Sequence, residues 1–324
     1  MSHSNHDHRA ARRHALAVMG AAVLASALPL HGALAQGTRE VRIGYQKYGT
    51  LTLLKGRATL EARLKEKGVN VKWTEFPAGP VLLEGLNVGS IDFGTVGEAP
   101  PIFAQAAGAN LVYVGYEPPS PASEAIVVPK GSPLRTLADL RGKKVALNKG
   151  SNVHYLLVKA LEKAGIAYKD IQTVFLPPAD ARAAFERGAV DAWVIWDPFL
   201  AAAEHQLGAR VLVDGSGLVA NHQFYLASRP YAEKNADIVA IVLEEIAKVD
   251  DWGRAHQSEV ASILAKQTGL ETAVLEKAAA RYSYGVKPVS SAVIAEQQKI
   301  ADAFTSLKLI PNSIIVKNAQ LAAR

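Results

Sequence analysis

Two polar loops carry residues that could bind a small anion. Gln46–Thr50 follows the apolar run Val41–Tyr45, and Asn148–Asn152 follows the apolar run Val145–Leu147. Each loop precedes a pattern typical of a helix. The first N–H groups of a helix have no partner within it, and the helix dipole favours negative charge there. The two loops are therefore candidates for anion binding by neutral donors.

The recurrence of such a loop is compatible with ligand binding and with a structural role. Neutral donors cost less to bury than charged side chains. The structural alternative is that Thr50 and Ser151 are N-caps while Gln46 and Asn148 satisfy loop backbone groups. The loops alone leave both interpretations open, and the binding candidates in them are Gln46, Tyr48, Gly49, Thr50, Asn148, Ser151, Asn152 and His154.

Three further turns could contribute to the same site. In Pro77–Pro80, Ala78 and Gly79 would let a backbone approach a ligand closely, although a turn followed by Pro at the first helical position explains them equally well. Gly97 and Glu98 end the next expected strand. We expect Glu98 to cap the helix that begins near Pro100; the alternative is that it faces a cleft and favours a ligand with a cationic group.

The segment Ile195–Phe199 offers an apolar and an acidic side chain at a strand end. Trp196 could line a binding cleft or fill the core, as most tryptophans do. Asp197 could cap the next helix or face the cleft. We interpret Trp196 as an apolar wall and Asp197 as a helix cap.

The elements that position these residues also occur twice. Val71–Gly79 is echoed by Ile171–Asp180, and Leu86–Gly94 by Phe185–Trp193. Repeated strand–loop–helix units predict two α/β lobes with a ligand cleft between them. We expect a discontinuous first lobe, residues 36–125 and 226–324, and an inserted second lobe, residues 126–225. One long helix is expected over residues 51–67.

Composition excludes several classes of function. The chain has 324 residues, a net charge of +6 without blocks of Lys or Arg, and no cysteine, which disfavours nucleic-acid binding and excludes thiol catalysis. The histidines are scattered, and neither a Gly-x-Ser-x-Gly turn nor a phosphate-binding loop occurs. We therefore expect no catalytic residue, no metal and no cofactor.

The N-terminus predicts export. Arginines precede the uncharged run Ala15–Leu28, and Ala33–Ala35 has the small-x-small pattern of a cleavage site. The run is shorter than the ~20 apolar residues of a membrane span. We expect a signal peptide over residues 1–35, cleaved after Ala35. The flanks of Arg12-Arg13 depart from a twin-arginine signal, which favours the general secretory route.

A family resemblance covers the chain from the first loop to about residue 235. The sequence resembles the periplasmic aliphatic sulfonate-binding proteins of ABC importers, within the nitrate/sulfonate/taurine-binding family. The matching segments are Gly44–Lys47, Phe76–Pro80, Leu86–Asp92, Pro100–Ala109, Tyr113–Gly115, Pro178–Phe185, Val190–Trp193, Ile195–Pro198 and Arg229–Asn235.

The resemblance implies a type II periplasmic binding fold, each lobe a mixed sheet flanked by helices. It also implies a monomer that captures an organosulfonate and passes it to a membrane permease. A sulfonate is an anion with acceptor oxygens only, so it requires donors. The alternatives are taurine, aromatic sulfonates, sulfate esters or nitrate as ligand, or a pyrimidine-related protein of the same fold.

Overall fold

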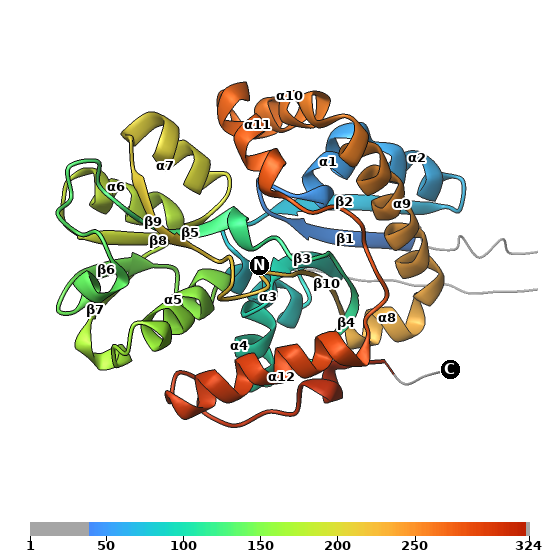
Figure 1. Cartoon of the computed structure of the whole chain (residues 1–324). Helices are drawn as coiled ribbons and strands as arrows, with labels where there is room; N and C mark the ends of the chain where they lie inside the picture. Colours follow the sequence, from blue (N-terminus) through green and yellow to red (C-terminus); the bar gives the residue numbers. More distant parts are fainter. Residues whose placement is uncertain (1–38, 322–324) are drawn as a thin grey trace, which may run out of the picture. The chain divides into compact units, whose positions relative to one another are not determined.

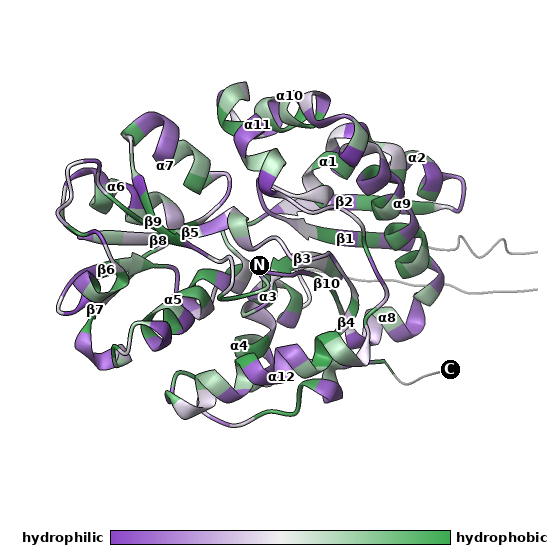
Figure 2. Ribbon diagram, in the orientation of Figure 1, coloured by the Kyte–Doolittle hydropathy of each residue, from purple (hydrophilic) through white to green (hydrophobic). Residues whose placement is uncertain are grey.

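The computed structural model describes residues 39–321, which belong to one compact unit. The expected signal peptide, residues 1–35, lies outside the described residues. Two separate sheets organise the chain, and helices flank both (Figure 1). Figure 2 shows hydrophilic and hydrophobic residues alternating along outer helices such as α9 (Ala236–Ala255) and α12 (Ser291–Ser306), because one face of each contacts the core.

The first sheet has the order β2-β1-β3-β10-β4. β1 pairs in parallel with β2 and β3, and β10 pairs antiparallel with β3 and β4. The strands are β1 (Arg39–Tyr45), β2 (Val69–Glu75), β3 (Phe93–Gly97), β4 (Leu111–Tyr116) and β10 (Gln223–Ser228). The helices of this lobe, besides α9 and α12, are α1 (Thr50–Arg57), α2 (Thr59–Lys65), α3 (Gly79–Asn87), α4 (Pro100–Ala106), α8 (Arg229–Lys234), α10 (Gln257–Thr268) and α11 (Thr272–Arg281).

The second sheet repeats this plan in the order β7-β6-β8-β5-β9. β6 pairs in parallel with β7 and β8, and β5 pairs antiparallel with β8 and β9. Its strands are β5 (Glu124–Val128), β6 (Lys144–Leu147), β7 (Gln172–Phe175), β8 (Ala192–Trp196) and β9 (Arg210–Asp214). Its helices are α5 (Asn152–Lys163), α6 (Pro178–Glu186) and α7 (Phe199–Leu207). The short 3₁₀ helices of the two lobes together are η1 (Pro121–Ser123), η2 (Leu137–Leu140), η3 (Tyr168–Asp170) and η4 (Val316–Ala319).

Side-chain alternation explains why both faces of each sheet are covered. On β10, Phe224 and Leu226 belong to one core cluster, whereas Tyr225 and Ala227 belong to another. Successive residues of a strand point to opposite faces, so one strand serves two cores. Among residues 39–321, no helix combines the length and hydropathy needed to cross a membrane.

Two expectations about element boundaries need correction. The helix expected over 51–67 is divided into α1 and α2 at Ala58, which has a left-handed φ of 54°. The lobe boundaries expected at residues 125 and 225 fall inside β5 and β10. The whole of β5 lies in the second sheet and the whole of β10 in the first. We therefore propose boundaries between Ser123 and Glu124 and between Asp214 and Gln223.

Two groups of helices also join the two lobes. α7 of the second lobe packs on α11 of the first, around Ala201, Ala202, Val274 and Ala278. We call this the charged contact, for the ion pairs that surround its alanines. Elsewhere, α5 of the second lobe contacts α4 and α12 of the first through Phe103, His154, Tyr155 and Phe304. We call this the aromatic contact.

Candidate functional site

A small cavity of about 40 Å³ lies between the lobes, where β3 faces the N-terminus of α5. A buried water needs roughly 10–15 Å³ of such volume, so the inner cavity accepts a group equivalent to a few waters. Every residue that lines it is uncharged. The lining consists of Gln46, Tyr48, Gly49, Gly79, Thr95, Gly97, Pro100, Asn152, Trp196, Gln223 and Tyr282.

Helix N-termini supply backbone donors to the inner cavity. Gly49 is the N-cap of α1, Gly79 is the first residue of α3, and Asn152 is the first residue of α5. None of these three helices has a side-chain cap. The N–H groups of the first residues, Thr50, Gly79 and Asn152, therefore can donate to a bound anion, and the three dipoles add to the attraction.

Glycines around the inner cavity allow neighbouring segments of the chain to approach one another closely. A Cβ atom on Gly97 would lie 2.8 Å from the Asn152 Cβ atom, across the junction of the two lobes. A Cβ atom on Gly79 would lie 2.9 Å from the Pro100 ring. Gly49 has a φ of 87°, a conformation that favours glycine. A larger residue at Gly97 would push the lobes apart.

Hydrogen bonds fix the side chains around the cavity. The Gln46 amide donates to the Thr95 carbonyl at 3.2 Å, and the Tyr48 hydroxyl donates to the Ala278 carbonyl at 2.6 Å. The Tyr282 ring packs edge-on against Tyr48, with centroids 5.5 Å apart. The site is therefore preorganised, which reduces the entropy lost when a ligand binds.

A larger outer cavity of about 290 Å³ adjoins the inner one and shares Gln46, Tyr48 and Trp196 with it. Its walls are mainly apolar: Phe76, Pro77, Pro177, Pro178, Ala179, Pro198 and Phe199. At its edge, Lys47 and Glu75 form an ion pair of 3.6 Å between partly exposed side chains. The two cavities together can hold a polar head and an apolar tail.

Several predicted residues lie outside the inner cavity because they have other partners. Thr50 is the first residue of α1, and its hydroxyl donates to Asp250 Oδ1 at 2.6 Å. The Ser151 hydroxyl donates to the Asn148 carbonyl at 2.7 Å and caps no helix. Asn148 lines neither cavity, and its buried Oδ1 atom has no partner among the described residues. Ala78 is a buried N-cap.

His154 belongs to the aromatic contact rather than to the cavity. Its Nδ1 atom accepts a hydrogen bond from the Gly150 N–H at 3.2 Å, so Nε2 carries the proton and donates to the Tyr168 hydroxyl at 2.7 Å. Burial, assisted by Lys149, lowers the pKa of His154 to about 4. The ring is therefore neutral near pH 7 and acts as a packing residue.

Two predicted carboxylates are buried away from the inner cavity. Burial raises the pKa of Glu98 to about 8, and Glu98 Oε2 accepts a hydrogen bond from the His222 N–H at 3.2 Å instead of capping α4. Glu98 lines a different cavity, beside His222 and Glu296. Asp197 Oδ1 accepts a hydrogen bond from the Ala201 N–H at 2.9 Å, at the start of α7, whose N-cap residue is Pro198.

Sequence reasoning missed Thr95, Pro100, Gln223 and Tyr282. Thr95 and Pro100 flank the predicted Gly97 and could have been found from the same strand end. Gln223 begins β10, which returns from the other lobe, and Tyr282 follows α11. No local motif marks either residue. Among residues 39–321, no three His, Asp or Glu side chains gather as they would around a metal ion.

Comparison with known proteins agrees with this architecture. The model of the NMT1/THI5-like family matches residues 64–260. The putative aliphatic sulfonates-binding protein of Escherichia coli is 49% identical over 279 residues, which is 86% of this chain and 87% of that protein.

Two solved structures of sulfonate-binding proteins are also similar to this chain. The alkanesulfonate-binding protein SsuA of Xanthomonas axonopodis pv. citri, bound to MOPS, superposes with a TM-score of 0.84 at 45% identity, covering 88% of this chain and 98% of that one. The periplasmic aliphatic sulphonate binding protein SsuA of E. coli gives a TM-score of 0.79 at 47% identity, covering 88% and 94%. The chain belongs to the NMT1/THI5-like family and, within it, to the group of the aliphatic sulfonate-binding proteins.

Proposed function

We propose that this protein is a periplasmic solute-binding protein that captures aliphatic sulfonates for an ABC importer. The observation that carries the proposal is the inner cavity, which is lined only by uncharged residues and faced by three uncapped helix N-termini. A sulfonate has three acceptor oxygens and no proton to donate. Donors without a buried counter-charge therefore match it at low desolvation cost.

The outer cavity supports an organic tail on that head group. Its apolar walls begin at Trp196, which also lines the inner cavity. Nitrate would leave the outer cavity unused, and taurine would place an ammonium group near Phe76 and Trp196. An alkyl tail gains about 0.8 kcal/mol for each CH₂ group that it buries there. The walls therefore favour alkanesulfonates over both alternatives.

The mechanism is capture by lobe closure. A ligand that contacts Gly49 and Tyr282 in one lobe and Asn152 and Trp196 in the other stabilises the closed state by its additional contacts there. A permease then recognises the closed state. We propose that the protein acts as a monomer without catalysis, and that it reaches the periplasm through a signal peptide cleaved after Ala35.

A panel of ligands in a thermal-shift assay, followed by calorimetry, tests this function. A ligand that binds only the folded protein raises its melting temperature. Methanesulfonate, hexanesulfonate, taurine and nitrate are compared at equal ionic strength. We expect hexanesulfonate to produce the largest shift and nitrate the smallest. Equal or greater stabilisation by nitrate, or no effect of any sulfonate, would contradict the proposal.

A further inference from the structure

A fully buried carboxylate follows Trp196, the residue that lines both cavities. Asp197 follows Trp196 and precedes Pro198, and its side chain is 0% exposed. Burial raises the pKa of Asp197 to about 7, and Arg281 is the main influence that lowers it. A buried carboxylate needs hydrogen bonds and a cation to remain charged. The cation here comes from the other lobe.

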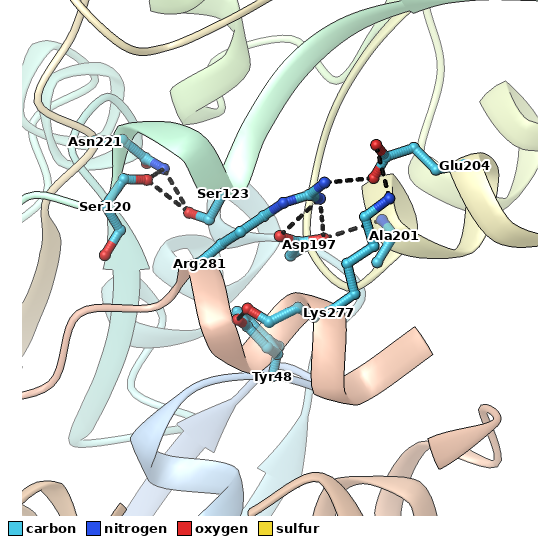
Figure 3. Close-up of polar contacts among 10 residues, drawn as sticks. Tyr48, Ser120, Ser123, Asp197, Ala201, Glu204, Asn221, Lys277 and Arg281 are labelled. Atoms are coloured by element: carbon cyan, nitrogen blue, oxygen red, sulfur yellow. Dashed lines mark hydrogen bonds and ion pairs between the residues drawn. The ribbon is translucent and has the colours of Figure 1, made fainter. Parts of the chain in front are cut away.

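Arg281, the last residue of α11, reaches across the charged contact. Its Nη1 atom lies 3.4 Å from both Asp197 oxygens, and its Nη2 atom lies 2.6 Å from Glu204 Oε2 on α7 (Figure 3). Lys277, one turn earlier on α11, pairs with Glu204 Oε1 at 3.0 Å. The Arg281 side chain is only 18% exposed, so these pairs are largely shielded from solvent. We call Asp197, Glu204, Lys277 and Arg281 the clasp.

The clasp is tied to the binding cavity on both of its sides. On the first-lobe side, Tyr282 is the neighbour of Arg281 and lines the inner cavity. On the second-lobe side, Trp196 is the neighbour of Asp197 and lines both cavities. Arg281 itself lines neither of them. Any movement that separates Arg281 from Asp197 therefore also separates the two walls that would enclose a ligand.

We propose that Arg281 is a positioning residue for ligand capture: by joining Asp197 and Glu204 across the lobes, it stabilises the closed state in which the two lobes enclose the ligand. This inference rests on the proposed function for its ligand, but the clasp itself is independent of ligand identity. It makes no contact with head or tail, so it strengthens the binding of every sulfonate by the same factor. It acts mainly by slowing ligand release.

The test compares Arg281→Ala with a matched control on the full exported protein. Arg63 also pairs with two carboxylates, Glu244 and Glu245, but all three lie in the first lobe. We expect Arg281→Ala to weaken methanesulfonate and hexanesulfonate equally, by about tenfold, within the usual range of coupling between sites. Stopped-flow measurements should assign the loss to faster release. Arg63→Ala should leave both affinities unchanged, and Arg281→Lys should recover part of the loss.

A second measurement tests the clasp without any ligand. The chain has no cysteine, so Arg187→Cys and Lys266→Cys introduce one spin label on each lobe. Arg281→Ala and Glu204→Gln should both shift the distance distribution toward longer distances, and Arg63→Ala should not. Unchanged distances in Arg281→Ala, or equal affinity losses in Arg281→Ala and Arg63→Ala, would overturn the inference. If the wild type bound no sulfonate, the proposed function would fail while the label distances would still decide the role of the clasp.

Discussion

The charged contact and the aromatic contact join the same two lobes by different chemistry. The charged contact packs alanines of α7 and α11 and surrounds them with the pairs made by Arg281 and Lys277. The aromatic contact packs Phe304 against Phe103 and His154, with ring centroids 4.9 Å and 5.4 Å apart. Both Phe304 and His154 are 0% exposed.

The difference lies in what each contact would lose when the lobes separate. Ion pairs that open are compensated by hydration, so their net contribution is small relative to their direct attraction. Aromatic rings that open expose apolar surface at a cost of about 25 cal/mol per Å². We therefore expect the lobes to part more readily at α7 and α11 than at α5 and α12. We expect the charged contact to affect affinity and the aromatic contact to affect stability.

The largest effect should come from Phe304→Ala in the aromatic contact. Removing a fully buried phenylalanine costs about 3–5 kcal/mol of unfolding free energy. Urea denaturation followed by circular dichroism measures this loss. Phe175→Ala is the control, because that ring also contacts His154 but is 42% exposed. A loss from Phe304→Ala no larger than that from Phe175→Ala would show that the aromatic contact is not core-like.

His154 should make the aromatic contact sensitive to acid. The folded protein holds His154 neutral down to a pKa of about 4, whereas the unfolded chain binds the proton near the ordinary value of 6.5. Lowering the pH from 6.5 to 4 therefore favours unfolding, by on the order of 3 kcal/mol. Denaturation midpoints of the wild type and His154→Gln, measured across this range, isolate the contribution of His154 from those of Asp197 and Glu98. Parallel pH profiles for the two proteins would contradict the expectation.

The same comparison explains how much of the fold the sequence predicts. Apolar alternation and glycine caps are local signals, and they indicated the repeated units that became two sheets of matching strand order. The halves of the charged contact have no such signal. Asp197 and Arg281 are far apart in the chain, and neither residue type indicates its partner.

The binding site likewise contains residues that local sequence signals indicate and residues that they do not. Gly49, Gly79 and Gly97 could be predicted because a strand-to-helix turn marks each of them. Thr50 was expected to face the cavity, but its partner is Asp250, on a helix distant in sequence. Tyr282 was missed for the converse reason, because tertiary packing alone brings it beside Tyr48.

The smallest effect should be a change in tail preference caused by Trp196→Ala. Trp196 is partly buried, packs edge-on against Phe199 at 6.1 Å, and lines the outer cavity. Its removal should weaken longer alkanesulfonates more than methanesulfonate, by about 0.8 kcal/mol for each CH₂ group no longer buried. Calorimetry on a chain-length series measures the slope, that is, how the loss of affinity depends on tail length.

Trp193, on the same strand but 1% exposed in the core, provides the control. Trp193→Ala should reduce stability by about 3–5 kcal/mol and leave the slope unchanged. If Trp196→Ala also left the slope unchanged, the outer cavity would not be the tail site.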